Sequence, residues 1–105
     1  MIVTTTDTLA GMEITETLGL TKGNVVRAKH VGSDIIASLR SIVGGEINEY
    51  TQLIAASREQ ALDRMIDDAK AMGADAIVGM RFTTSTVAQG SSEILAFGTA
   101  VKVKG

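Results

Sequence analysis

One segment near the end of the sequence constrains the fold more than any other. Residues 94–101, ILAFGTAV, are almost continuously apolar. A strand with one face in water alternates polar and apolar side chains, whereas a strand that is apolar throughout is covered on both faces. A strand pattern over 76–87 and a turn at Gln89-Gly90-Ser91 precede this segment. We therefore predict a hairpin whose return strand, 93–103, needs a cover on each side.

The first cover is a long helix predicted over residues 46–72. Apolar and small side chains recur there at intervals of three and four, as on the buried side of a helix. They are Tyr50, Ile54, Ser57, Ala61, Met65, Ala69 and Met72. Gly73 is a natural residue to end this helix. At a rise of 1.5 Å per residue the helix would be about 40 Å long, which is long for one small domain.

The second cover is predicted to be another copy of the chain, because no other helix of comparable length is expected. Alternation along the first strand of the hairpin places Val78, Met80 and Phe82 on one face and Ile77, Gly79, Arg81 and Thr83 on the other. We expect the small residues Gly79, Ala96, Gly98 and Ala100 on the face away from the helix, where they would let two sheets approach closely. The prediction is a closed homo-oligomer.

The N-terminal part of the chain is predicted to form a second hairpin. Apolar and polar residues alternate over 12–20, with Glu16 as a lapse, Lys22-Gly23-Asn24 signals a turn, and 25–31 returns as a strand. Residues 2–6 favour a short additional strand. A short helix capped by Ser33 or Asp34 is expected to run to Val43 and to end at Gly44-Gly45. Together the patterns indicate one α+β domain, 1–105: an antiparallel or mixed sheet of two hairpins, packed on one long helix and one short helix.

Composition excludes several classes of protein. The sequence has no cysteine, which removes disulfides, thiolate nucleophiles and zinc-ribbon chemistry. No apolar run approaches the roughly 20 residues of a membrane helix, and residues 1–7 do not resemble a secretory signal, so we expect a cytoplasmic protein without a membrane partner. Ten Lys and Arg against twelve Asp and Glu, with a net charge of −2, give no basic stripe for nucleic acid.

The candidate metal ligand is His30, the one histidine of the chain. Soft metals favour thiolate, thioether and imidazole ligands, but Met65, Met72 and Met80 are predicted to lie in the core. A metal site would therefore require several copies of His30 gathered at a subunit interface or on a symmetry axis; the alternative is a partly buried, hydrogen-bonded histidine. For hard cations, Asp63, Asp67 and Asp68 are interspersed with Arg64 and Lys70, which favours a solvated charged face.

Two charged residues of the predicted C-terminal hairpin, Arg81 and Glu93, are candidate polar anchors. They are placed among small and apolar residues, where a charge needs a partner or solvent. The simplest interpretation is a salt bridge between chains or a position at a rim; the functional alternative is an anchor in a ligand pocket between subunits. No catalytic residue is predicted, because one histidine must supply every imidazole role and no G-x-S-x-G motif occurs.

Three separated blocks of the sequence, 42–51, 73–82 and 96–101, resemble the YbjQ-like family, and the similarity covers essentially the whole chain. The resemblance implies a compact α+β subunit, grouped with dodecin-like folds and assembled as a homopentamer. The family carries the label "putative heavy-metal-binding" and has no established activity. Phe97 stands where relatives commonly have Tyr, and Thr83 where many have Asp.

The function predicted from these observations is a homo-oligomeric, pentameric binding or scaffold module that needs no cofactor. The first alternative is a metal-binding protein with ligands gathered between subunits, and the second is an enzyme of unknown class. Any ligand site is expected at an interface or on the symmetry axis.

Overall fold

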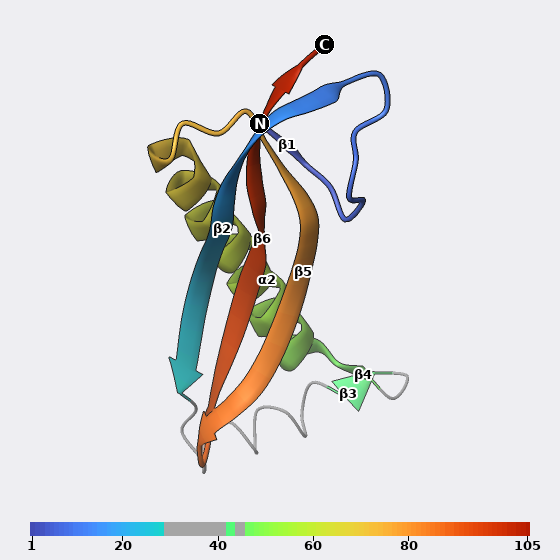
Figure 1. Ribbon diagram of the computed structural model, residues 1–105. Helices are drawn as coiled ribbons and strands as arrows, with labels where there is room; N and C mark the ends of the chain where they lie inside the picture. Colours follow the sequence, from blue (N-terminus) through green and yellow to red (C-terminus); the bar gives the residue numbers. More distant parts are fainter. Residues whose placement is uncertain (29–41, 44–45) are drawn as a thin grey trace.

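The computed structural model describes residues 1–28, 42–43 and 46–105, with side chains over 1–27 and 51–105. Its elements are β1 (Ile2–Val3), β2 (Glu13–Ala28), β3 (Ile42–Val43), β4 (Glu46–Ile47), the helix α2 (Asn48–Ala71), β5 (Ala76–Ala88) and β6 (Ser91–Lys104) (Figure 1). The α+β prediction is confirmed. The helix begins and ends within two residues of its predicted bounds, because its apolar repeat extends over six turns.

The main sheet has four strands in the order β1-β5-β6-β2. β1 pairs parallel with β5, and the other pairs are antiparallel, so the sheet is mixed. The predicted C-terminal hairpin is confirmed as β5 and β6. The strand predicted over 2–6 is shorter than expected, at Ile2–Val3.

The predicted N-terminal hairpin is wrong, because β2 runs without a turn for 16 residues. Gly23, which we expected in that turn, lies in mid-strand opposite Ala96. A Cβ atom at this position would overlap Met65 N and Ala61 O and lie 2.7 Å from Arg64 C. The glycine therefore lets the backbone of α2 approach the strand, a demand that local sequence does not reveal.

Most of the expected short helix, residues 33–41, lies outside the described residues. Its last two residues, Ile42 and Val43, form β3 and pair with Ile47 and Glu46 of β4. The expectation of a helix at those two positions is therefore wrong. Two-residue ladders of this kind are set by contacts that periodicity does not encode.

The main core lies between α2 and the sheet. Ala61, Met65 and Ala69 of the helix are fully buried against Ala96 and Ala100 of β6. A Cβ at Gly98 would lie 2.8 Å from Ile77 Cγ2. Ala96 and Ala100 lie under the helix. The prediction that they lie on the face away from the helix is therefore wrong. Their small side chains let α2 pack closely on the sheet.

Gly79 changes the face to which β5 directs its side chains. It adopts φ 62°, which favours glycine, and the pairing shifts between Val78 and Arg81. As a result Met80 joins the core under α2, whereas Val78 joins a second core with Leu9 on the other face. The prediction that these two residues share a face is wrong, because alternation fails across a bulge.

The N-terminal segment covers part of the face away from α2. Leu9 is 8% exposed and packs with Ala76, Val78 and Val101. The backbone of the segment is tied to β5, since the amides of Gly79 and Met80 donate to the carbonyls of Thr6 and Thr4 at 2.8 and 2.9 Å. The chain therefore supplies part of the second cover that we assigned to another copy.

A hydrogen-bonded side-chain pair also fixes α2 to β2. Thr21 is fully buried, and its Oγ1 lies 2.9 Å from Met65 O and 3.1 Å from Asp68 Oδ2. The backbone amide of Lys22 donates to the same carboxylate oxygen at 3.1 Å. Asp68 is thus a structural acceptor, although it is exposed like its neighbours Asp63 and Asp67.

Candidate functional site

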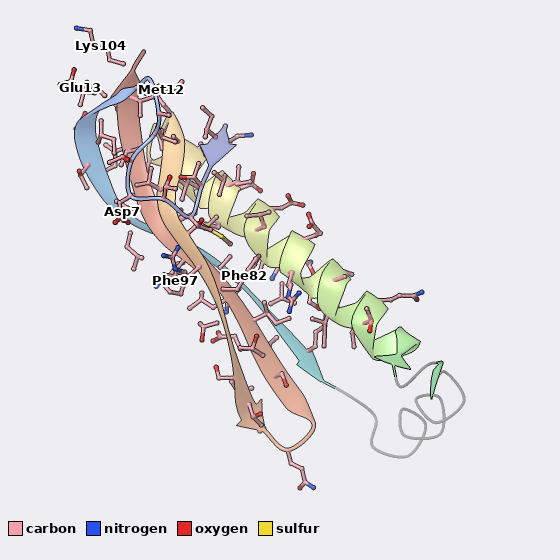
Figure 2. The ribbon with its side chains drawn as sticks, turned by 90° about the vertical axis from the view of Figure 1, so that its right-hand side faces the viewer. Asp7, Met12, Glu13, Phe82, Phe97 and Lys104 are labelled. Atoms are coloured by element: carbon pink, nitrogen blue, oxygen red, sulfur yellow. The ribbon has the colours of Figure 1, made fainter. Side chains whose placement is uncertain are left out.

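The N-terminal half of α2 borders a cleft over the sheet. Figure 2 shows that the helix and the strands diverge toward this end of the helix. The cleft has a volume of about 160 Å³. Its lining comes from α2, β2, β5 and β6: Arg27, Leu53, Ile54, Ser57, Arg58, Thr84, Ser92 and Ile94. The site therefore combines two cations, three hydroxyl groups and three aliphatic side chains.

Strand register explains why these residues share one space. Val25 pairs with Ile94 and is buried under α2, so Arg27, two residues further along β2, faces the same side opposite Ser92. Thr84 of β5 pairs with Ile94 and completes the floor. The strands thus direct a guanidinium and two hydroxyls toward the helix.

Arg27 is held in place by neutral partners. Its Nε donates to Ser57 Oγ at 3.1 Å, and its Nη2 donates to Gln60 Oε1 at 2.8 Å. Ser57 is 1% exposed, and its hydroxyl donates to Leu53 O at 2.8 Å, which turns its lone pairs toward Arg27. The guanidinium is therefore oriented without its charge being neutralised.

The cleft is positively charged. Neither Arg27 nor Arg58 has a carboxylate partner among the residues whose side chains are described, and the lining contains no acidic residue. Glu93 lies next to two lining residues in sequence, but it is placed on the other face of β6 and accepts a hydrogen bond from Asn24 Nδ2 at 3.0 Å. The electrostatics therefore favour an anion.

A second feature is an apolar surface on the sheet face away from α2, below the N-terminal segment. We call it the open face and define it by Leu20, Val26, Leu95 and Phe97. Leu20 is 63% exposed and Val26 55% exposed, while Leu95 and Phe97 are half-buried. Figure 2 shows Phe97 on this side of β5 and Phe82 on the side of the helix. This part of the sheet thus has an uncovered surface on which the four apolar side chains alternate with polar strand partners such as Lys22, Asn24 and Glu93.

The shape of the chain is extended. Its radius of gyration is 17.1 Å and its extents are 52 × 28 × 16 Å, whereas a compact chain of this length has a radius of gyration of about 13 Å. Residues 81–90, which include the end of β5 and the hairpin turn, are all exposed. A single chain therefore leaves the far end of its hairpin largely in water.

The two predicted polar anchors lie on the same sheet face but are not brought together. Arg81 pairs with Phe97, and its Nη1 donates to Thr5 O at 2.9 Å and to Met80 O at 2.8 Å. Glu93 lies four residues before Phe97 in β6, opposite Ser85 and Val26. Arg81 thus secures the N-terminal segment, and Glu93 bonds Asn24, within one chain. Their role between chains stays a prediction.

The predicted metal ligand His30 lies outside the described residues. Met65 and Met80 are buried in the main core, as expected. Within 1–27 and 51–105, no three His, Cys, Asp or Glu side chains are grouped so that they could hold a metal ion. The described helix, α2, is not apolar enough to cross a membrane.

Sequence analysis missed the cleft as a site. No role was predicted for Arg27. Its position two residues after Val25 and four after Gly23, both directed toward α2, was the available signal. That signal was hidden because a turn was predicted at Gly23, which reversed the expected course of the chain.

The fold and the cleft define a small α+β protein with a basic pocket between its helix and its sheet. A family model of the YbjQ type, described as "Putative heavy-metal-binding", matches residues 1–104. A UPF0145 protein of Methanosarcina acetivorans is 56% identical over 103 residues, 98% of this chain and 97% of its own length. A UPF0145 protein of Vibrio parahaemolyticus is 59% identical over 103 residues, 98% of each chain.

This chain belongs to the YbjQ-like family, as its sequence resemblance predicted. The names of these relatives state no reaction. A crystal structure of a protein of unknown function from Pediococcus pentosaceus, assigned to the DUF74 family, has a similar fold, with a TM-score of 0.70. The match covers 99% of this chain and 98% of that protein's chain, and the two sequences are 16% identical. The likeness therefore concerns the fold alone.

Proposed function

We propose that this protein is a non-catalytic, homo-oligomeric binding or scaffold module of the cytoplasm, built as a closed ring of five subunits. The observation that carries the proposal is the open face, an apolar surface on an extended subunit. The number of subunits and the dodecin-like arrangement rest on the family resemblance. Catalysis is left out because a sequence with one histidine and no cysteine has few groups for nucleophilic chemistry.

The occupant of the open face is proposed to be a second copy of the chain. A large side chain such as Leu20 gains about 1.5–3 kcal/mol when it is moved from water to a fully buried site, and four apolar side chains share this surface. The surface continues along the exposed end of β5, where Val87 is 55% exposed. In a closed ring the open face of each copy packs on a different surface of the next copy, and closure of the ring leaves no copy unpaired.

A pair of matched lysine substitutions tests the proposal. Leu20→Lys places a charge on the open face, whereas Gln52→Lys adds the same charge at an exposed position of α2. We expect Leu20→Lys to lower the molar mass measured by light scattering toward that of one chain and to lower the melting temperature. Gln52→Lys should behave like the wild type. An unchanged mass for Leu20→Lys would contradict the role of the open face.

The family description favours metal binding as the second candidate function. The side chains described here do not fit a heavy-metal site, because they offer no thiolate and no group of three ligating residues. A metal would have to use His30 and carboxylates of several subunits. Elemental analysis of the purified protein and of His30→Ala tests this alternative: stoichiometric metal lost with His30 would support it, and metal-free wild type after metal loading would reject it.

A further inference from the structure

We propose that the cleft between α2 and the sheet binds a small organic anion, one carboxylate or phosphate group on an apolar body the size of a single ring. The site lies within one subunit and is lined by Arg27, Arg58 and Ser92 around an aliphatic wall. This inference rests on the binding role in the proposed function but not on the assembly of subunits.

The first argument is the orientation of Arg27. Two of its nitrogens are engaged by Ser57 and Gln60, which leaves the N–H groups of Nη1 for a ligand. A planar guanidinium matches the two oxygens of a carboxylate or phosphate. Because the guanidinium is fixed before a ligand arrives, binding costs less side-chain entropy.

The second argument is the charge of the cleft. Arg58 adds a second cation to the same lining, and no carboxylate among the described side chains neutralises either group. A cleft lined by one sign of charge concentrates its field on an ion of the opposite sign. The hydroxyls of Thr84 and Ser92 supply further donors on the sheet, on the same side as Arg27.

The third argument concerns size and polarity. Leu53, Ile54 and Ile94 form the aliphatic part of the lining. An apolar cavity of about 150 Å³ accepts benzene, and this cleft measures about 160 Å³. An anion with no apolar body would leave these side chains without a partner, so the geometry selects an amphipathic ligand and not a bare inorganic ion.

Calorimetric titration with four probes tests the inference. Benzoate and phenyl phosphate carry the two anionic groups on one ring, benzyl alcohol removes the charge, and inorganic phosphate removes the ring. We expect saturable binding of benzoate or phenyl phosphate, and at least about tenfold weaker binding of benzyl alcohol and of phosphate, because hydrogen bonds to charged groups are the stronger class. Comparison of the two ring compounds distinguishes a carboxylate site from a phosphate site.

Matched arginine variants locate the site. Arg27→Met should weaken binding at least about tenfold, and Arg27→Lys, which keeps the charge but loses the planar fork, should restore only part of it. Arg64→Met removes the same charge from a residue that bonds Asn24 O outside the cleft, so it should leave affinity unchanged. A thermal melt of each variant shows whether it is folded.

Two results would overturn the inference. The first is that neither ring anion shows saturable binding up to about 10 mM, a concentration that would reveal a millimolar affinity. The second is that folded Arg27→Met binds the ring anions as tightly as the wild type. Sedimentation of the same samples separates this outcome from a failure of the proposed assembly. An oligomer that binds neither probe rejects the ligand site alone, and a monomer that binds them rejects the assembly alone.

Discussion

Gly23 sets how closely α2 approaches β2. Its position in the strand leaves no room for a Cβ atom, because the backbone of Ala61 and Met65 lies directly above it. Neither partner is the flexible end of a side chain, so the helix would have to move as a whole. The small side chains Ala96 and Ala100 serve the same close approach on β6.

Gly23→Ala is therefore expected to destabilise the fold strongly. Overpacking a core costs about 1–3 kcal/mol, and contact with helix backbone places this change at the upper end of that range. Chemical denaturation, followed by circular dichroism, measures the loss.

Gly11→Ala is the matched control. Gly11 has φ 75°, and a Cβ there meets nothing within 4 Å, so only the conformational cost of about 1–2 kcal/mol applies. If Gly23→Ala were no more destabilising than Gly11→Ala, the close approach of α2 to β2 would be contradicted.

For individual residues, the sequence predicted which side chains lie in the core better than it predicted which side chains line the cleft. Met65 and Ala69 were placed correctly because a helical repeat fixes their common side. The hydrogen-bond partners of Arg81 and Arg27 within the chain were not predicted, because Thr5 and Ser57 are distant from them in sequence. The presence of an arginine in the sequence does not reveal which carbonyl or hydroxyl group its side chain will bond.

Among the elements, α2 and the β5–β6 hairpin could be predicted, since each depends on a local repeat and a local turn. The continuity of β2 could not, because a glycine that permits helix packing looks the same as a glycine in a turn. The bulge at Gly79 likewise moved Val78 and Met80 to different cores. Local periodicity identifies elements, but the faces they present depend on their neighbours.

The far end of β5 is the element most sensitive to assembly. Beyond Met80 its one strand neighbour, within the described ranges, is β6, and its side chains are exposed. Such a segment opens easily in an isolated subunit. We expect hydrogen exchange over 81–90 to be slow in the wild type and clearly faster in Leu20→Lys. Fast exchange in an assembled wild type would show that the neighbouring subunits leave this segment uncovered.

At the scale of the whole molecule, the apolar character of β6 predicted a strand covered on both faces, and in the structure the second face of this strand is covered only in part. Leu9 of the same chain covers the upper part through Val101. Leu20, which is level with Thr99, and Val26 lie on the same face and are 63% and 55% exposed, so the rest of this face is uncovered. We therefore propose that a second copy covers the rest of this sheet face, whereas the basic cleft lies within one chain. Assembly and ligand binding can thus be tested separately.

Sedimentation velocity of the wild-type protein over a range of micromolar concentrations measures whether the chain assembles. We expect one species near five times the 11.0 kDa mass of a chain, with little change on dilution. A folded, stable species with the mass of a single chain throughout that range would contradict it, because the open face of Leu20 and Phe97 would then have no need of a partner.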